Sequence, residues 1–185
     1  DASGKGYLAA KLDDALQKRD LRVANINIDG WLHLPHIRFD KNNLAENFYL
    51  RAIRFEEMFE KLILPLRDRR TIAIEMDYAE ETATEYRKQL CDYVDIDVIL
   101  LEGIYLLKRP LQSYYDLALW IDCSFETALE RALARGQEGL PPDETIQAYR
   151  TIYFPAQRIH FARDNPRSRA MAIINNDPRL TDLSL

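Results

Sequence analysis

The chain begins with Asp1-Ala2-Ser3-Gly4-Lys5-Gly6-Tyr7-Leu8-Ala9-Ala10, and the turn at Gly4 and Lys5 decides the fold that we expect. It matches the second half of the phosphate-binding pattern G-x-x-x-x-G-K-[ST], in which backbone N–H groups surround the phosphates of a nucleotide and the lysine contacts the β and γ phosphates. Counting back five residues places the first glycine of the pattern, and the strand before it, ahead of Asp1. We therefore expect a cofactor-binding loop made by Ser3, Gly4, Lys5, Gly6 and Tyr7.

One position of this loop departs from the pattern. Gly6 stands where the pattern has Ser or Thr, whose hydroxyl normally binds Mg²⁺. A four-residue match also occurs by chance, and the alternative interpretation is a glycine turn before an amphipathic helix. The remainder of the chain has to decide between the two.

Composition indicates one globular domain and excludes several functions. The chain has 185 residues, of which 47% are apolar and 30% charged. A net charge of −5 argues against a general nucleic-acid partner. Cys91 and Cys123 suggest no disulfide framework. No apolar run approaches the roughly 20 residues that span a bilayer, so we expect no membrane partner and take the cytoplasm as the default location. The oligomeric state is not determined by the sequence.

Helices and strands alternate along the chain. Apolar residues at helical spacing predict helices over 5–18, 44–66, 125–135 and 143–163, the last interrupted near Pro155, and a polar segment up to Lys88 is also expected to be helical. Apolar runs predict strands over 22–28, 71–74, 97–101, 116–121 and 170–174. This order predicts an α/β fold with a doubly wound parallel sheet, in a single domain over 1–185 with a small lid around 124–142.

The chemistry-bearing residues lie where such a sheet places ligands, beyond the carboxyl ends of its strands. Asp29 follows the strand over 22–28 and is a candidate base and Mg²⁺ ligand, and Glu102 ends the strand over 97–101 as a second metal ligand. Arg131 and Arg135 share one helix face and are candidate catalytic residues that close over the phosphates. Lys5, in the loop, is a further candidate catalytic residue. Each has an ordinary alternative, a turn for the acids and a solvated face for the arginines.

Together these segments resemble the uridine kinase and phosphoribulokinase group of P-loop kinases, nearly from end to end. The resemblance rests on Ser3 to Lys5, Ile28-Asp29-Gly30-Trp31, Phe48 to Leu66, Met76-Asp77-Tyr78, Leu101-Glu102-Gly103-Ile104, Trp120 to Arg135, and Ala170 to Ile174. It implies ATP and Mg²⁺ as cofactors and Asp29 as the catalytic base. It also implies that Tyr49, Asp77 and Tyr78, with Asp29, contact a small-molecule acceptor that carries a hydroxyl group.

Two departures from the group leave the acceptor open. Met76 stands where those enzymes commonly carry an aromatic residue, and Glu80 and Glu81 add negative charge that suits a hydroxyl-rich or cationic acceptor. The leading hypothesis is an ATP-dependent kinase of a nucleoside or a sugar-like molecule. The alternatives are a nucleotide-binding sensor or partner protein that no longer transfers phosphate, which Gly6 would explain, and a kinase of nucleotides, against which the Glu80-Glu81 pair argues.

Overall fold

The computed structural model describes residues 2–39, 42–136 and 138–183, and the chain divides into two compact units. Unit 1 consists of residues 1–5, 39–50 and 104–185, and unit 2 consists of residues 6–38 and 51–103.

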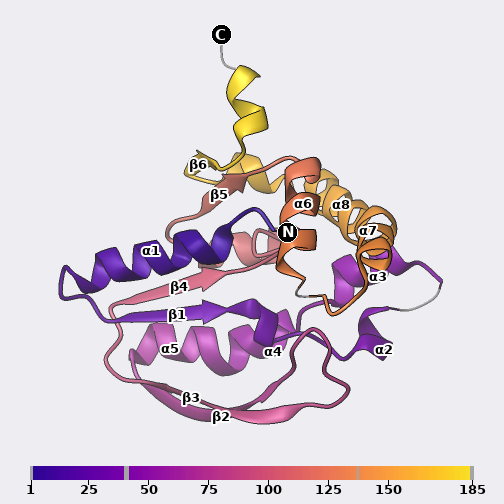
Figure 1. Ribbon diagram of the computed structural model, residues 1–185. Coiled ribbons are helices and arrows are strands. Elements are labelled where there is room, and N and C mark those ends of the chain that lie inside the picture. Colours follow the sequence, from indigo (N-terminus) through magenta and orange to yellow (C-terminus); the bar gives the residue numbers. More distant parts are fainter. Residues whose placement is uncertain (1, 40–41, 137, 184–185) are drawn as a thin grey trace. The chain divides into compact units, whose positions relative to one another are not determined.

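Unit 2 is built around two parallel strands. Its elements are α1 (Lys5–Gln17, which starts at the unit boundary), β1 (Val23–Asn27), η1 (Ile28–Gly30), α2 (Pro35–Arg38), α4 (Phe55–Met58), η2 (Phe59–Ile63), α5 (Leu64–Arg69), β2 (Ile72–Tyr78), β3 (Arg87–Tyr93) and β4 (Val98–Glu102). β1 and β4 pair in register from Val23 with Val98 to Asn27 with Glu102. They lie between α1 and the α4–α5 segment (Figure 1). The carboxyl ends of the two strands, which carry the acidic residues, therefore meet at one edge.

A β-hairpin in unit 2 replaces the helix that we predicted up to Lys88. β2 and β3 are antiparallel, with Asp77 opposite Lys88 and Tyr78 opposite Arg87. The prediction was wrong because polar residues hide the strand pattern of β3, whereas opposite charges facing each other across a hairpin stabilise it. β2 also runs on to Tyr78, so Asp77 and Tyr78 lie inside the strand and not beyond its end.

Unit 1 combines a second parallel pair with a helical layer. Its elements are α3 (Leu44–Arg51, whose last residue is counted with unit 2), η3 (Arg109–Tyr114), β5 (Leu119–Asp122), α6 (Phe125–Arg135), α7 (Pro142–Ala148), η4 (Tyr149–Tyr153), α8 (Phe154–Asp164), η5 (Pro166–Arg169), β6 (Ala172–Asn175) and η6 (Pro178–Leu183). β5 and β6 pair from Leu119 with Ala172 to Asp122 with Asn175. The ring of Phe125 stacks on Phe154 at 4.3 Å, which joins α6 to α8.

Two prolines lie inside helical segments, one at the end of the helix predicted over 44–66 and one at the interruption predicted near Pro155. Pro65 and Pro155 occupy the first turn of α5 and α8, and a π-helical turn, η2 or η4, precedes each of them. A proline ring removes one backbone donor and crowds the carbonyl four residues earlier. A π turn widens the backbone at that place, so the helical direction continues through the proline.

A buried carboxylate fastens α3 to α8 within unit 1. Asp164 accepts hydrogen bonds from the Tyr49 hydroxyl at 2.7 Å and from the Arg109 backbone N–H at 3.0 Å, and its Oδ2 lies 2.7 Å from His160 Nδ1. Burial opposes ionisation of Asp164, but these hydrogen bonds outweigh it and hold its pKa below the ordinary value. Nearby, burial lowers the pKa of Lys108, whose Nζ lies 4.4 Å from the centre of the Tyr49 ring, to about 8.

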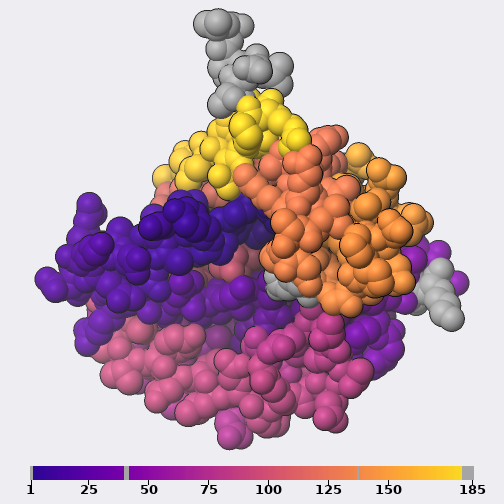
Figure 2. Space-filling model, viewed as in Figure 1, coloured from indigo at the N-terminus to yellow at the C-terminus, as the bar shows by residue number. Residues whose placement is uncertain are grey.

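The α/β class with parallel strands is thus confirmed. The described residues form three two-stranded sheets, β1–β4, β2–β3 and β5–β6, and the complete doubly wound sheet and the single domain with a lid stay predictions. In the described ranges no helix is long and apolar enough to cross a membrane. α1, indigo in Figure 2, lies on the surface of the molecule, and its Tyr7 side chain is 73% exposed.

Candidate active site

The turn at Ser3 and Gly4 has the geometry that requires glycine. Gly4 adopts φ +93°, and a Cβ at this position would lie 2.3 Å from Nδ2 of Asn176. The left-handed backbone conformation therefore favours glycine, and a larger residue would also displace the Asn176 amide. The Asn176 Nδ2 donates to the carbonyl of Ser3 at 2.7 Å, and Ser3 is 92% buried, with 8% of its surface exposed. Asn176, which directly follows β6, was not among the predicted site residues.

Arg131 lies beside the same turn. Its Nη1 donates to the Ser3 carbonyl at 3.4 Å and its Nη2 to the Asn176 carbonyl at 2.9 Å. The guanidinium group thus contacts the backbone of the predicted phosphate loop. Sequence reasoning placed Arg131 near the phosphates, but not on these carbonyls.

Arg135 contacts the segment that follows α6. Its Nη2 lies 3.0 Å from Oε1 of Glu138, and the same oxygen accepts a hydrogen bond from the Tyr149 hydroxyl at 2.8 Å. Gly136 ends α6 with φ +61°, a left-handed conformation that glycine adopts without strain. The side chains of Arg131 and Arg135, both on α6, therefore contact different groups.

α1 begins at Lys5, directly after the turn, and the start of a helix offers free N–H groups and a positive dipole end to an anion. Gly6 is the second residue of this helix. A Cβ added there would lie 3.5 Å from Oε1 of Glu102, which is ordinary van der Waals contact. Glu102, from the end of β4, thus lies beside the first turn of α1.

Asp29 lies just beyond β1, in the short helical turn η1. The Asn27 side chain accepts a hydrogen bond from the Asp29 backbone N–H at 2.7 Å and so fixes this turn. In the described part of the chain no hydrogen bond or ion pair is formed by the Asp29 carboxylate, which is partly exposed. Because Asn27 pairs with Glu102, Asp29 and Glu102 belong to the same edge of the β1–β4 pair.

The segment after Asp29 pairs with the end of the hairpin. The Ala79 N–H donates to the Gly30 carbonyl at 3.1 Å, and the Tyr78 ring occupies the space above Gly30, where a Cβ would lie 2.2 Å from it. The Asp77 side chain forms an ion pair with Lys88 at 2.7 Å. Of the predicted acceptor residues, Asp29 and Tyr78 therefore lie in neighbouring segments. Asp77 directly precedes Tyr78 in β2.

The two extra acids of this region are neutralised by arginines. Glu80 pairs with Arg87 at 2.7 Å, and Glu81 pairs with the buried Arg38 at 2.9 Å. Their pairing removes the sequence argument that free negative charge selects a cationic acceptor. It equally weakens the argument against an acceptor that carries phosphate.

Arg54 is a buried residue of this region that sequence reasoning missed. Its guanidinium lies 5.3 Å from the Trp31 ring and 4.7 Å from the Tyr86 ring, pairs with Glu57 at 2.6 Å and donates to the backbone carbonyl of Asp77. It therefore joins the segment after β1 to the hairpin. The signal in the sequence was weak, because a single arginine inside the helix predicted over 44–66 looks like a residue of its solvated face.

Tyr49, the remaining predicted substrate residue, lies in unit 1. It is 5% exposed, and its hydroxyl is donated to Asp164. Burial and this hydrogen bond raise its pKa well above the ordinary value. These contacts are those of a core residue.

The predicted metal ligands fit Mg²⁺ only together with a nucleotide. Among the residues that the structure describes, no group of three His, Cys, Asp or Glu side chains could hold a metal ion by itself. Mg²⁺ differs from most metals in that one or two carboxylates plus substrate phosphates and water suffice to bind it. Glu102 beside the first turn of α1, and Asp29 at the same edge, satisfy this requirement.

No protein-family model matches the chain, and no curated protein matches it. Solved structures do. A protein proposed to be a uridine kinase from Bacillus stearothermophilus is similar with a TM-score of 0.72 and 19% identity, over 93% of this chain and 82% of that one. A protein proposed to be a fructose transport system kinase from Silicibacter sp. TM1040 is similar with a TM-score of 0.73 and 19% identity, over 93% and 84%.

These similarities define the class of fold. The chain has the fold of the uridine kinase-like P-loop kinases, which confirms the resemblance that the sequence indicated. At 19% identity the similarity concerns the fold alone, so activity and substrate have to be argued from the residues.

Proposed function

We propose that the protein is an ATP- and Mg²⁺-dependent kinase that transfers the γ-phosphoryl group to a hydroxyl of a small molecule, a nucleoside or a sugar-like compound. The observation that carries the proposal is the glycine-requiring turn at Ser3 and Gly4, which leads directly into α1, in a chain with a kinase fold. Such a turn before a helix is the arrangement that binds phosphate groups in proteins.

Each residue has a distinct role in this proposal. Lys5 binds the β and γ phosphates, and Arg135 supplies further positive charge when it exchanges Glu138 for phosphate. Asp29, whose carboxylate has no partner among the described residues, accepts the proton of the acceptor hydroxyl as the hydroxyl oxygen bonds to the γ-phosphorus and the bond from that phosphorus to the leaving ADP breaks. Glu102 holds Mg²⁺, which when bound neutralises charge on the phosphate oxygens. Tyr78, against Gly30, shapes the acceptor side.

The proposed acceptor class rests on the residues around Asp29 and on the neighbours together. The partly exposed aromatic side chains there, Tyr78 and Tyr86, suit the flat face of a base or the apolar face of a sugar ring. The two similar structures are named for a nucleoside and for a sugar. A neutral, hydroxyl-bearing ring is therefore the acceptor to test first.

The test is a thermal-shift screen with ATP, with and without Mg²⁺, followed by nucleosides and sugars, and then by phosphorylated sugars and nucleotides as a second set. A ligand that binds only the native state raises its stability by RT ln(1 + [L]/Kd). We expect a shift with Mg·ATP that grows with one acceptor, and consumption of ATP that depends on that acceptor. No shift with any nucleotide would refute the proposal.

Gly6 favours one further candidate function. The usual hydroxyl ligand of Mg²⁺ is absent at this position, so a protein that binds ATP without transferring phosphate would also suit the site. Such a sensor or partner protein would show a nucleotide shift with no acceptor-dependent ATP consumption. The same screen therefore separates the two functions.

A further inference from the structure

The carbonyl of Ser3, in the predicted phosphate loop, is held by side chains. Two side chains from distant parts of unit 1 donate to it, the amide of Asn176 at 2.7 Å and the guanidinium of Arg131 at 3.4 Å. The donors also hold each other, because Arg131 Nη2 donates to the Asn176 carbonyl at 2.9 Å. The Asn176 backbone is in turn fixed to β5, since its N–H donates to the Asp122 carbonyl at 3.0 Å.

The orientation of this carbonyl determines the orientation of the next N–H group. The peptide bond between Ser3 and Gly4 is planar and, as no described peptide bond is cis, trans. In a trans peptide the carbonyl and the N–H point in opposite directions. A Ser3 carbonyl that points at Asn176 and Arg131 therefore turns the Gly4 N–H away from both side chains.

The Gly4 N–H is left available by this arrangement. It donates to no residue in the described part of the chain. The absence of a Cβ on Gly4 is what allows Asn176 to approach this closely, since a Cβ would lie 2.3 Å from its Nδ2. An unpaired, oriented N–H immediately before the start of α1 is the type of donor that binds a phosphate oxygen.

We propose that Asn176 and Arg131 are positioning residues, which hold the Ser3–Gly4 peptide so that the Gly4 N–H faces the polyphosphate of a bound nucleotide. This inference rests on the proposed nucleotide-binding function. It gives Arg131 a role through the loop backbone, whereas the sequence suggested direct contact with phosphate. Asn176 holds the Ser3 carbonyl, and this role requires the NH₂ group of its side chain as a hydrogen-bond donor.

The chain offers a direct probe of this peptide. Of the six glycines in the sequence, only Gly4 follows a serine. Protein labelled with ¹³C at serine carbonyls and ¹⁵N at glycine therefore gives one amide correlation signal, which reports the Ser3 carbonyl and the Gly4 N–H together. Hydrogen bonds to a carbonyl shift its ¹³C resonance, so the signal reads the proposed contact without any ligand.

The variant is Asn176→Asp, which has the same shape but replaces the donating NH₂ with an oxygen that repels the Ser3 carbonyl. The matched control is Asn175→Asp. It adds the same charge one residue earlier, where the side-chain oxygen only accepts a hydrogen bond, from the Asp177 N–H at 3.0 Å, and keeps that ability. Thermal unfolding confirms that both variants are folded.

In the absence of ligand, we expect the Ser3–Gly4 signal to move in Asn176→Asp and to stay in place in the control. With inorganic tripolyphosphate and with Mg·ATP, we expect the wild type and the control to bind and to shift the Gly4 amide, and Asn176→Asp to bind at least about 10-fold more weakly, as the loss of one oriented donor worth about 1.4 kcal/mol implies.

Two results would overturn the inference. One is an unchanged Ser3–Gly4 signal in ligand-free Asn176→Asp, which would mean that the amide does not hold the peptide. The other is equal binding of tripolyphosphate by Asn176→Asp and the control. Failure of the wild type to bind either ligand would instead refute the proposed function, and the ligand-free signal would still decide whether Asn176 holds the peptide.

Discussion

Replacing Gly6 with serine should restore the metal ligand that the phosphate loop lacks. The added Cβ would lie 3.5 Å from Glu102 Oε1, so a serine fits without a clash, and its hydroxyl, one bond further out, would stand beside the carboxylate that we propose as the Mg²⁺ ligand. One more ligand that is worth about 1.4 kcal/mol raises the affinity about 10-fold. We therefore expect Gly6→Ser to increase the ratio of ATP affinities with and without Mg²⁺ about 10-fold.

The matched control is Gly6→Ala, because both substitutions also affect the helix. Gly6 is the second residue of α1, and removing a glycine from a helix stabilises it by up to about 1 kcal/mol with alanine and about 0.5 kcal/mol with serine. Titration calorimetry of ATP, in Mg²⁺ and in EDTA, separates the effects, since only serine adds an oxygen. If the two variants give the same Mg²⁺ dependence, the reasoning that places the metal beside Gly6 and Glu102 is refuted.

Three further predictions concern single side chains. Asp29→Asn should leave ATP binding nearly unchanged and lower turnover about 10²-fold or more, as the loss of a general base does; equal turnover in a steady-state assay would remove Asp29 from the mechanism. The folded-state pKa of Lys108, about 8, is below its ordinary value of 10.5. Between these two pH values the unfolded chain binds more protons than the folded chain, so the free energy of unfolding should rise by up to about 2.5 kcal/mol from pH 8 to 10. Urea unfolding of Lys108→Met should show no such rise, and a rise as large as that of the wild type would contradict the assignment. Ser124→Ala removes the N-cap of α6, whose hydroxyl accepts from the Thr127 N–H at 3.2 Å, and should cost about 1 kcal/mol in the same assay; no loss would mean that the cap does not contribute.

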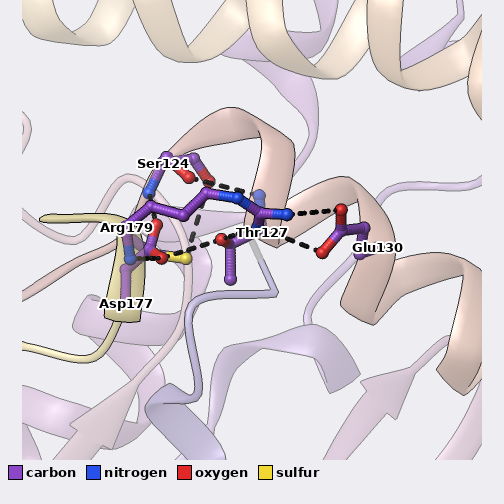
Figure 3. Close-up of polar contacts among 6 residues, drawn as sticks. Ser124, Thr127, Glu130, Asp177 and Arg179 are labelled. Carbon is purple, nitrogen blue, oxygen red and sulfur yellow. Dashed lines mark hydrogen bonds and ion pairs between the residues drawn. The ribbon is translucent and has the colours of Figure 1, made fainter.

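The Ser124 cap belongs to a polar network at the start of α6, which Figure 3 shows. Asp177 accepts hydrogen bonds from the Ser124 N–H at 2.7 Å and from the Thr127 hydroxyl at 2.8 Å, and Arg179 forms two hydrogen bonds with Glu130. Burial opposes ionisation of Asp177, but its hydrogen bonds outweigh burial and keep its pKa far below the ordinary value. The residues after β6 are thereby fixed to α6, close in sequence to Asn176.

Local signals predicted the elements that local interactions determine. α6 spans Phe125–Arg135 as expected, because Ser124 can cap its start and Gly136 can adopt the left-handed conformation at its end. The acids Asp29 and Glu102 were placed correctly after strands, since the short strand pattern over 22–28 and the continuous apolar run over 97–101 are both local signals. Boundaries of this kind depend on a few neighbouring residues.

Other features depend on residues that are distant in sequence, and these were missed. The hairpin partner of Asp77 is Lys88, and cross-strand pairing leaves no mark in the periodicity of β3. The contact of Asn176 with Ser3 cannot be read from either residue alone, because both are short polar residues in turns. The helix predicted over 44–66 divides at Arg51 because Ile53 pairs with Leu32, a contact that helical spacing does not report.

The hydrogen bond between Ser3 and Asn176 joins residues that are 173 positions apart, almost the whole length of the chain. During synthesis at about 5–20 residues per second, Ser3 is made many seconds before its partner Asn176. The loop at Ser3 and Gly4 therefore reaches its final conformation only when β6 has been made and has folded. A chain that stops before residue 176 would lack this support, so we expect it to bind tripolyphosphate more weakly than a chain that contains Asn176.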